Sequence, residues 1–398
     1  MRQRRHSGCG LASFLAALLV LVLALGLVYV TDNVPQRFID LVNPMQFEMP
    51  TTLPPVARPV ELSRAGRFRF QYMQLNEQLQ AVYRLIYDAL PSFPESIAIP
   101  RIGEADMQMV FNALVYDQPL LFMISSTRYR IRLQDGYVVG FMPEYRLDRD
   151  EYVRRVQTVA DRASEIPLPP GGTDFEIQLA LHDFLLANCT YSDDLTNCEI
   201  ATVYGALIVG EASCVGYSKA MLLLLELNGI DAYIVTGYAE NASFSGPHAW
   251  NKVRLGGNWY YMDATWNDPV MPDGREIVSR AYFNLTAQEL SATHELGPSM
   301  ASSTAMNYFR ARGLYFDALD RSTEARIAQA IVEAVQARRG VAELRMSDAA
   351  GFAQAQEYLF GRQGRIHRIL AAANLQHLQV YRSSVDELNI IRIFLVEN

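Results

Sequence analysis

Between residues 214 and 265 the sequence places an apolar helix directly before three strands, and this order restricts the fold more than any other feature of the chain. The mostly apolar residues 214–227 predict the helix, and residues 230–238 predict the first strand. Residues 249–265 predict two further strands around Gly256-Gly257-Asn258, a sequence typical of a tight hairpin. Because hairpin strands are antiparallel, this region predicts an α+β unit with an antiparallel sheet.

Three side chains within this region suit nucleophilic catalysis. Cys214 opens the predicted helix, where the amide dipoles favour negative charge and therefore the reactive thiolate. His248 lies on the first hairpin strand, and an imidazole within hydrogen-bond reach would take the thiol proton. Asp263 lies on the second strand, where a carboxylate would orient the imidazole and stabilise its charge. The structural alternatives are a buried thiol, a core histidine and a strand-end carboxylate.

The length of the hairpin turn decides whether His248 and Asp263 can meet. In a two-residue turn Leu255 lies opposite Asn258, and the numbers of paired residues then have an odd sum. The numbers of His248 and Asp263 also have an odd sum, so both side chains face the same side of the sheet as near neighbours. A three-residue turn would place them on opposite faces. The Gly-Gly-Asn sequence favours the short turn.

Cys214, His248 and Asp263 lie in sequence segments that together form a recognisable pattern. These segments are Gly205–Ala220 and Leu227–Asp231 around the cysteine, Gly246–Asn251 around the histidine, Trp259–Trp266 around the aspartate, and Tyr282–Leu285 with His294 further on. In order and spacing they resemble the transglutaminase-like superfamily, across about residues 170–300. The resemblance implies an α+β, papain-like core and a Cys-His-Asp catalytic triad, which would be Cys214, His248 and Asp263 by position.

The resemblance also implies a chemistry, without fixing the reaction. The thiolate of an active member would attack an amide carbonyl, form a thioacyl enzyme, and transfer the acyl group to an amine or to water. We therefore expect a thiol enzyme that acts on peptide-like amides of a protein or a cell-wall peptide, as an acyltransferase or a peptidase. The alternative is a non-catalytic binding or assembly module that retains the fold. No cofactor is implied.

Further residues around the expected site have open roles. The backbone N–H of Cys214 would supply one oxyanion donor, and Tyr191 or Tyr204 is a candidate for the second. Trp250 and Trp266 are expected either in the core or in the walls of a substrate cleft. Cys189 and Cys198 are nine residues apart and could pair as a disulfide or stay reduced.

Other functional classes are less compatible with the sequence. The remaining histidines show no metal-ligand spacing, so no metal is expected, and His294 is expected to be structural. Asp268 is a rival acid, but Pro269 follows it and favours a loop. The formal net charge of −8 argues against nucleic acid as a partner.

The amino terminus predicts export. Arg2, Arg4 and Arg5 precede an uncharged apolar run at residues 11–30, which is long enough to span a bilayer of roughly 30 Å as a helix. An uncleaved single-pass anchor is favoured, with a cleaved signal peptide and a buried helix as the alternatives. In the first two cases the bulk of the chain is extracytoplasmic, membrane-bound or secreted.

The sequence divides into six expected segments. They are a basic cytoplasmic tip at 1–10, the anchor at 11–30, a Pro-rich linker at 31–66, a mainly helical region at 67–166, the transglutaminase-like core at 167–300 and a small α/β region at 301–398.

Overall fold

The computed structural model describes residues 66–194, 196–241, 244–269, 277–297, 301–337 and 339–396. The predicted anchor at 11–30 and nearly all of the predicted linker lie outside these residues. Among the described residues, no helix has both the length and the apolar character needed to cross a membrane. The fold is mixed α+β with antiparallel sheets.

The chain divides into two compact units. The first takes in the chain up to Pro167 together with Ser192–Ile234, and the second takes in Leu168–Tyr191 together with Val235–Asn398. The predicted nucleophile, Cys214, therefore belongs to the first unit, whereas His248 and Asp263 belong to the second.

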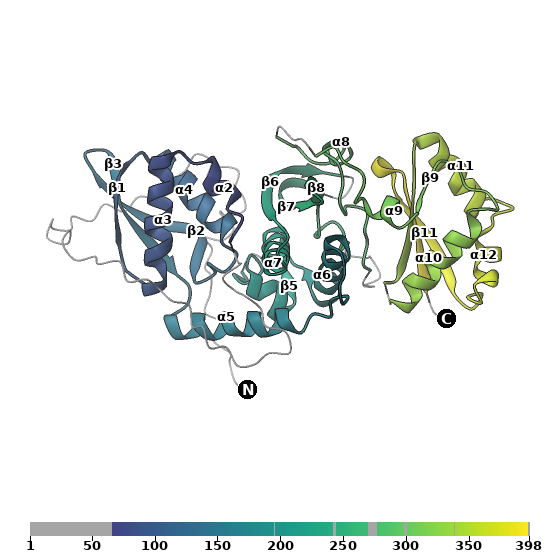
Figure 1. Ribbon diagram of the computed structural model, residues 1–398, viewed down its shortest axis with the longest axis horizontal. Coiled ribbons are helices and arrows are strands. Elements are labelled where there is room, and N and C mark those ends of the chain that lie inside the picture. Colours follow the sequence, from purple (N-terminus) through teal and green to yellow (C-terminus); the bar gives the residue numbers. More distant parts are fainter. Residues whose placement is uncertain are drawn as a thin grey trace. The chain divides into compact units, whose positions relative to one another are not determined.

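The first unit contains a three-stranded sheet of strand order β1-β3-β2, with helices α3 and α4 packed against it (Figure 1). The bounds of its elements are α2 Phe70–Gln74, α3 Glu77–Ala89, η2 Leu90–Ser92, β1 Ile97–Ile102, α4 Glu104–Asp117, β2 Ile124–Gln134, β3 Tyr137–Tyr145, α5 Arg149–Ser164, η3 Gly205–Val209, β5 Glu211–Ala212 and α7 Cys214–Leu227. Val82 and Ile86 of α3, Val110 and Leu114 of α4 and Phe141 of β3 are fully buried in one apolar cluster.

The sheet adds three strands to the helices of this region, which the sequence predicts to be mainly helical. Strands β2 and β3 pair antiparallel, and the chain turns between them at Asp135-Gly136, where both residues have positive φ. An Asp-Gly pair is a strong two-residue hairpin sequence, and it was overlooked. Strand β1 was also missed. It contains Pro100, and a proline is compatible with a strand at the edge of a sheet, where β1 lies.

Two buried carboxyl groups hold residues 66–72 on this unit. Glu226, on the last turn of α7, accepts hydrogen bonds from the backbone N–H groups of Gly66 at 2.6 Å and Phe68 at 3.1 Å. Asp117, the last residue of α4, accepts from the N–H groups at the start of α2. Burial raises the pKa of Glu226 to about 8 and that of Asp117 to about 7, although the backbone donors oppose this rise.

We predict that Glu226→Gln flattens the pH dependence of stability. The folded-state pKa of about 8 lies above the unfolded value of about 4.3, so the contribution of Glu226 to stability is complete below about pH 4.3 and is lost as the pH rises towards 8. Denaturant unfolding of the wild-type chain should show a fall of a few kcal/mol between pH 5 and pH 8. The Gln variant should show a smaller fall. The exposed variant Glu95→Gln is the control, and an equal slope in all three proteins would contradict the prediction.

The second unit contains two sheets. Its elements are α6 Asp174–Asn188, β4 Thr190–Tyr191, most of β6 Ala232–Glu240, β7 Ser245–Leu255, β8 Asn258–Met262, α8 Ala287–Leu290, α9 Tyr308–Ala311, β9 Tyr315–Phe316, α10 Glu324–Gln336, β10 Val341–Met346, α11 Ala349–Phe360, α12 Ile366–Ala372, β11 Gln379–Val385, η4 Asp386–Leu388 and β12 Ile390–Val396. One sheet has the order β6-β7-β8, and the other has the order β11-β12-β10-β9.

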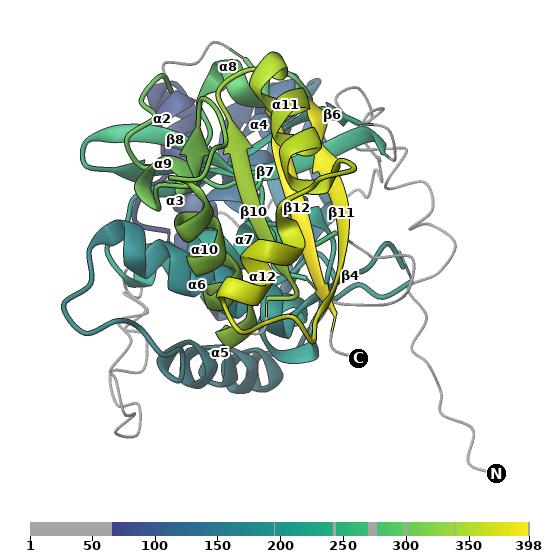
Figure 2. The same cartoon turned by 90° about the vertical axis from the view of Figure 1, so that its right-hand side faces the viewer.

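In the sheet of order β11-β12-β10-β9, helices α10, α11 and α12 lie in front of the strands in the view of Figure 2. Strand β12 pairs antiparallel with both β10 and β11, whereas the short β9 pairs parallel with β10. Helix α10 and strands β10 and β12 follow the apolar periodicity of their segments.

Candidate functional site

Cys214 is the first residue of the 14-residue helix α7, as the sequence predicts, and its side chain is partly exposed. The carbonyl oxygen of Ile200 fixes the start of this helix, because it accepts a hydrogen bond of 2.8 Å from the N–H of Ser213. The same oxygen lies against Gly216, where an added Cβ would sit only 2.1 Å away. The glycine therefore permits the close packing that holds the first turn of α7, whose N–H groups have no acceptor within the helix itself.

We predict that Gly216→Ala destabilises this end of α7. The new methyl group would overlap a backbone oxygen that cannot rotate away, at an expected cost of about 2–4 kcal/mol, which outweighs the better helix propensity of alanine. Thermal and denaturant unfolding measure the effect. Gly297→Ala is the matched control, since an added Cβ there meets no atom within 4 Å. Equal stability of the two variants would contradict this role of Gly216.

The β7–β8 hairpin brings His248 and Asp263 together, as the register argument predicts. Leu255 pairs with Asn258 across a two-residue turn, in which Gly256 and Gly257 have φ of 53° and 82°. Positive φ at both positions is the requirement of a type I′ turn, which explains the two glycines. His248 lies on β7, Asp263 follows the last residue of β8, and Nε2 of the imidazole lies 2.8 Å from Oδ2 of the carboxylate.

The Asp263 carboxylate is fully buried and held from several sides. Its Oδ1 accepts from the backbone N–H of Trp266 at 3.1 Å, and its Oδ2 also lies 3.1 Å from Nε2 of His294. Burial alone would raise the pKa of Asp263. The charge of His248 and the hydrogen bonds from His248 and His294 outweigh it and hold this pKa well below its usual range. The carboxylate therefore stays ionised and can only accept hydrogen bonds.

A second buried network fixes the turn that follows Asp263. Asn267 donates its backbone N–H to the carbonyl of Asp263. Its side-chain Nδ2 lies 3.0 Å from Nε2 of His182, and its Oδ1 accepts a hydrogen bond from the backbone N–H of Tyr282. Burial lowers the pKa of His182, so this histidine stays neutral. Asp268 lies in the same turn and bonds through its N–H to Thr265, which agrees with its prediction as a loop residue.

The two tryptophans of the predicted cleft differ in exposure. Trp250 is fully buried and packs edge-on to His294 with a centroid distance of 4.8 Å, so it is a core residue and not an accessible wall. Trp266 is partly exposed, and its ring centroid lies 5.6 Å from that of His248. Of the two tryptophans, only Trp266 is exposed enough to line a substrate cleft.

The two candidate oxyanion tyrosines are both partly exposed. Tyr204 belongs to the first unit and lies under the guanidinium of Arg155, with a cation–π distance of 4.5 Å. Tyr191 is the second residue of β4 in the second unit. Their assignment as oxyanion donors stays a prediction.

The disulfide that the sequence allows between Cys189 and Cys198 is not formed. Both residues are described, and Cys189 is a buried thiol whose Sγ donates to the carbonyl of Thr190 at 3.9 Å. Cys189 caps the end of α6, so its side chain is taken into the core of its own unit. It behaves as a small apolar residue there.

Sequence reasoning missed three features of the site. It treated His294 as a structural residue and did not connect it with Asp263, because no local pattern links residues 31 apart. It did not consider Tyr116 of α4, where burial and the nearby charge of Cys214 raise the pKa to about 12. It also gave no role to Lys219 of α7, whose pKa burial lowers to about 8 with a further contribution from Arg146.

Among the described residues, His248, Asp263 and His294 bring ligand-type atoms within 4.8 Å of one another. A metal ion could in principle use such a set. However, the two N···O separations of 2.8 and 3.1 Å are those of hydrogen bonds between imidazole donors and one carboxylate oxygen. We therefore interpret the group as a hydrogen-bonded network.

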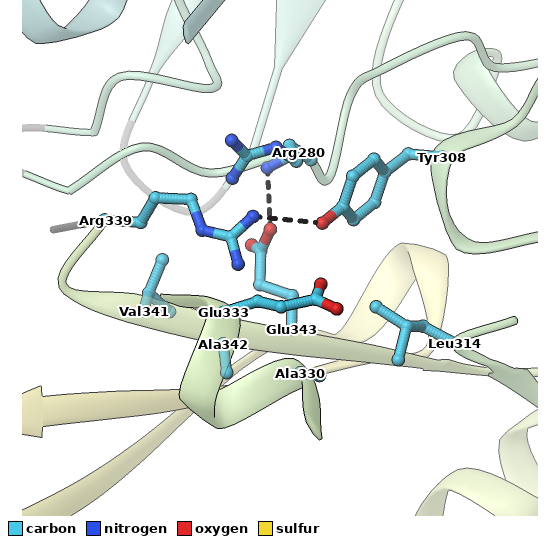
Figure 3. A pocket seen from close by; sticks show the side chains of 9 residues that line it. All are labelled: Arg280, Tyr308, Leu314, Ala330, Glu333, Arg339, Val341, Ala342 and Glu343. Carbon is cyan, nitrogen blue, oxygen red and sulfur yellow. Dashed lines mark hydrogen bonds between the residues drawn. The ribbon is translucent and has the colours of Figure 1, made fainter. Parts of the chain in front are cut away.

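A small pocket lies elsewhere in the second unit, between Arg280 and strand β10 (Figure 3). Glu343 accepts from the backbone N–H of Arg280 at 2.6 Å, and Arg339 donates to the hydroxyl of Tyr308 at 3.3 Å. Glu343 also accepts hydrogen bonds from Ser279 and Arg392, and Asp183 forms an ion pair with Arg280. The positive charges of the arginines are therefore largely neutralised by the carboxylates. None of the residues in this pocket belongs to the predicted site.

Comparison with known proteins confirms the class that this geometry suggests. The family model of the transglutaminase-like superfamily matches residues 168–264, so the chain carries a transglutaminase-like domain that includes Cys214, His248 and Asp263. This superfamily includes cysteine-dependent acyltransferases and proteases. No curated protein matches the chain.

Three solved structures share local similarity with the chain. A putative cysteine protease from Cytophaga hutchinsonii is 22% identical (TM-score 0.23), covering 31% of this chain and 41% of its own. A TGase is 14% identical (TM-score 0.26), covering 35% and 44%. The periplasmic domain of TgpA from Pseudomonas aeruginosa, bound to ethylmercury, is 16% identical (TM-score 0.20), covering 33% and 60%. The chain thus spans less than two thirds of each of these structures.

Proposed function

We propose that the chain is a thiol enzyme that acts on peptide-like amides, with Cys214 as the nucleophile, His248 as the base and Asp263 as the residue that orients the base. The observation that carries this proposal is the buried His248–Asp263 hydrogen bond of 2.8 Å. The position of Cys214 at the start of α7 supports it, since a helix N-terminus stabilises a thiolate. A papain-like arrangement of this core is part of the proposal.

The Asp263 contact determines which imidazole nitrogen exchanges protons. Because the carboxylate can only accept, Nε2 of His248 must carry a hydrogen. The thiol proton of Cys214 therefore passes to Nδ1. The resulting imidazolium is stabilised by the buried negative charge of Asp263, which is the role of the acid in such triads.

The proposed reaction has two halves. The thiolate sulfur of Cys214 attacks the amide carbonyl carbon, and the oxyanion that forms accepts a hydrogen bond from the backbone N–H of Cys214. The C–N bond then breaks, the leaving amine takes the proton from Nδ1 of His248, and a thioester remains on Cys214. An amine or a water molecule next attacks the thioester and gives its proton to Nδ1, and the sulfur leaves as the thiolate. The acceptor decides between acyl transfer and hydrolysis.

We further propose that the enzyme works outside the cytoplasm. The support is the uncharged run at residues 11–30 behind three arginines, which suits a single-pass anchor or, alternatively, a cleaved signal peptide. A membrane-tethered or secreted position would place the enzyme near surface proteins and cell-wall peptides, and these are the proposed substrates. The regions at 67–166 and 301–398 are then domains that flank the core.

We predict that Cys214→Ala abolishes turnover and leaves the fold intact. The substrate for this test is a panel of amide peptides, offered with and without a primary amine and followed by mass spectrometry. Loss of the nucleophile should lower kcat by at least about a thousandfold. Cys189→Ala is the matched control, because it removes a buried thiol outside the triad and should keep turnover.

The outcome also separates the alternatives. Products that carry the amine would identify an acyltransferase, and products with a new carboxyl group would identify a hydrolase. Turnover that survives in Cys214→Ala would contradict the proposal. If Cys214→Ala rescued the phenotype of a gene deletion as well as the wild type does, the non-catalytic module would be the better description.

A further inference from the structure

His294 approaches the same carboxylate oxygen as His248. Its Nε2 lies 3.1 Å from Oδ2 of Asp263, and the side chains of both residues are fully buried. Since the carboxylate only accepts, Nε2 of His294 must carry a hydrogen as well. Two imidazole N–H groups thus converge on a single oxygen, and only one of them belongs to the proposed catalytic set.

The other ring nitrogen of His294 lies beside the Thr293 hydroxyl, which also contacts the carbonyl of Leu290 at 3.4 Å. Nδ1 lies 2.9 Å from the hydroxyl oxygen of Thr293. In the neutral ring with hydrogen on Nε2, Nδ1 is an acceptor, and the Thr293 hydroxyl can donate to it. Both ring nitrogens of His294 therefore have a hydrogen-bond partner in this arrangement.

The position of His294 does not depend on this contact. Its backbone forms an antiparallel bridge with Ala239 of β6, and the neighbouring N–H and C=O groups of Thr293 and Glu295 pair with Glu240 and Tyr238. The ring also packs against Trp250 and Trp266, at centroid distances of 4.8 and 4.5 Å. A sheet edge and two indoles therefore hold the imidazole at a set place beside Asp263.

We propose that His294 is a positioning residue for the reaction: its Nε2–H keeps the Asp263 carboxylate ionised and turned towards His248 while His248 gains and loses its proton. This inference rests on the proposed function. His248 changes charge during turnover, so it alone cannot hold a buried carboxylate equally in both states. His294 supplies a second N–H donor to the same oxygen, from a ring that takes no part in the proposed proton transfer. Among the described residues Tyr282 also lies near Asp263, and its phenol stays neutral because burial raises its pKa far above the ordinary value.

The contact has a second consequence, because the two donors share one oxygen. Because Oδ2 accepts from both N–H groups, each hydrogen bond weakens the other. The hydrogen bond from His294 therefore reduces the attraction between Asp263 and protonated His248. Removal of His294 should therefore strengthen the His248–Asp263 bond whenever the carboxylate stays in place. The imidazolium would then keep its proton to higher pH.

The test compares two substitutions at one position. His294→Phe keeps an aromatic ring between the indoles but loses the N–H, whereas His294→Gln restores an amide N–H near the place of Nε2. We expect His294→Phe to lower kcat about tenfold with little change in KM and to move the alkaline limb of the pH–rate profile upward. His294→Gln should recover part of the rate and move the limb back. If Phe lowers the rate without any movement of the pH profile, or if Gln is no better than Phe, the proposal is overturned.

A readout that needs no turnover separates this inference from the proposed function. In the full chain carrying Cys214→Ala, proton NMR should show two downfield imidazole N–H resonances from the donors to Asp263. His294→Phe should remove one and shift the other further downfield, as expected for a strengthened bond. An unshifted His248 resonance would overturn the inference. If the resonances behave as expected while the wild-type chain turns over none of the amide peptides, the proposed function is rejected and this role of His294 is kept.

Should His294→Phe fail to fold, Thr293→Val provides the same test from the other side of the ring. Valine keeps the shape of threonine but removes the hydroxyl next to Nδ1, so the Nε2–H tautomer is no longer favoured. A further downfield shift of the His248 resonance supports the proposal, and an unchanged spectrum contradicts it.

Discussion

The site depends on one buried charge, the carboxylate of Asp263. A carboxylate without solvent is unstable unless donors surround it, and here the donors are two histidines and the backbone N–H of Trp266. This requirement explains why the residues after β8 turn back so tightly and why His294 returns to the site from beyond α8. It also sets the orientation of His248, since an ionised acid accepts only from a protonated Nε2.

The part of the site that could be predicted from the sequence is the part governed by local geometry. The two-residue turn at Gly256-Gly257 fixes the register of β7 and β8, and parity then places His248 and Asp263 on one face. The start of α7 at Cys214 follows in the same way from the apolar run and its end at Asn228. Periods of two and 3.6 residues and turn chemistry are enough for these assignments.

The rest depends on contacts between distant segments, which no local pattern encodes. His294 reaches Asp263 across 31 residues, and Glu226 reaches Gly66 across 160. Trp250 was ambiguous between core and cleft because the alternation of β7 does not say which face is covered, and the structure buries it fully. The sheet of the first unit was underestimated because the Asp135-Gly136 turn was overlooked and a proline interrupts the edge strand β1. For His294, Glu226 and Trp250 the missing information was tertiary, whereas the Asp135-Gly136 turn is a local pattern that the sequence does contain.

The central claim is that His248, oriented by Asp263, activates Cys214. The most direct measurement is the rate of Cys214 alkylation across pH in the wild-type chain and in His248→Ala, since only the thiolate reacts. The account predicts that the wild type is alkylated rapidly well below about pH 8.5, the usual pKa of a thiol, and that His248→Ala reacts only as the pH approaches that value. Identical pH profiles for the two proteins would contradict it, because Cys214 would then gain nothing from His248.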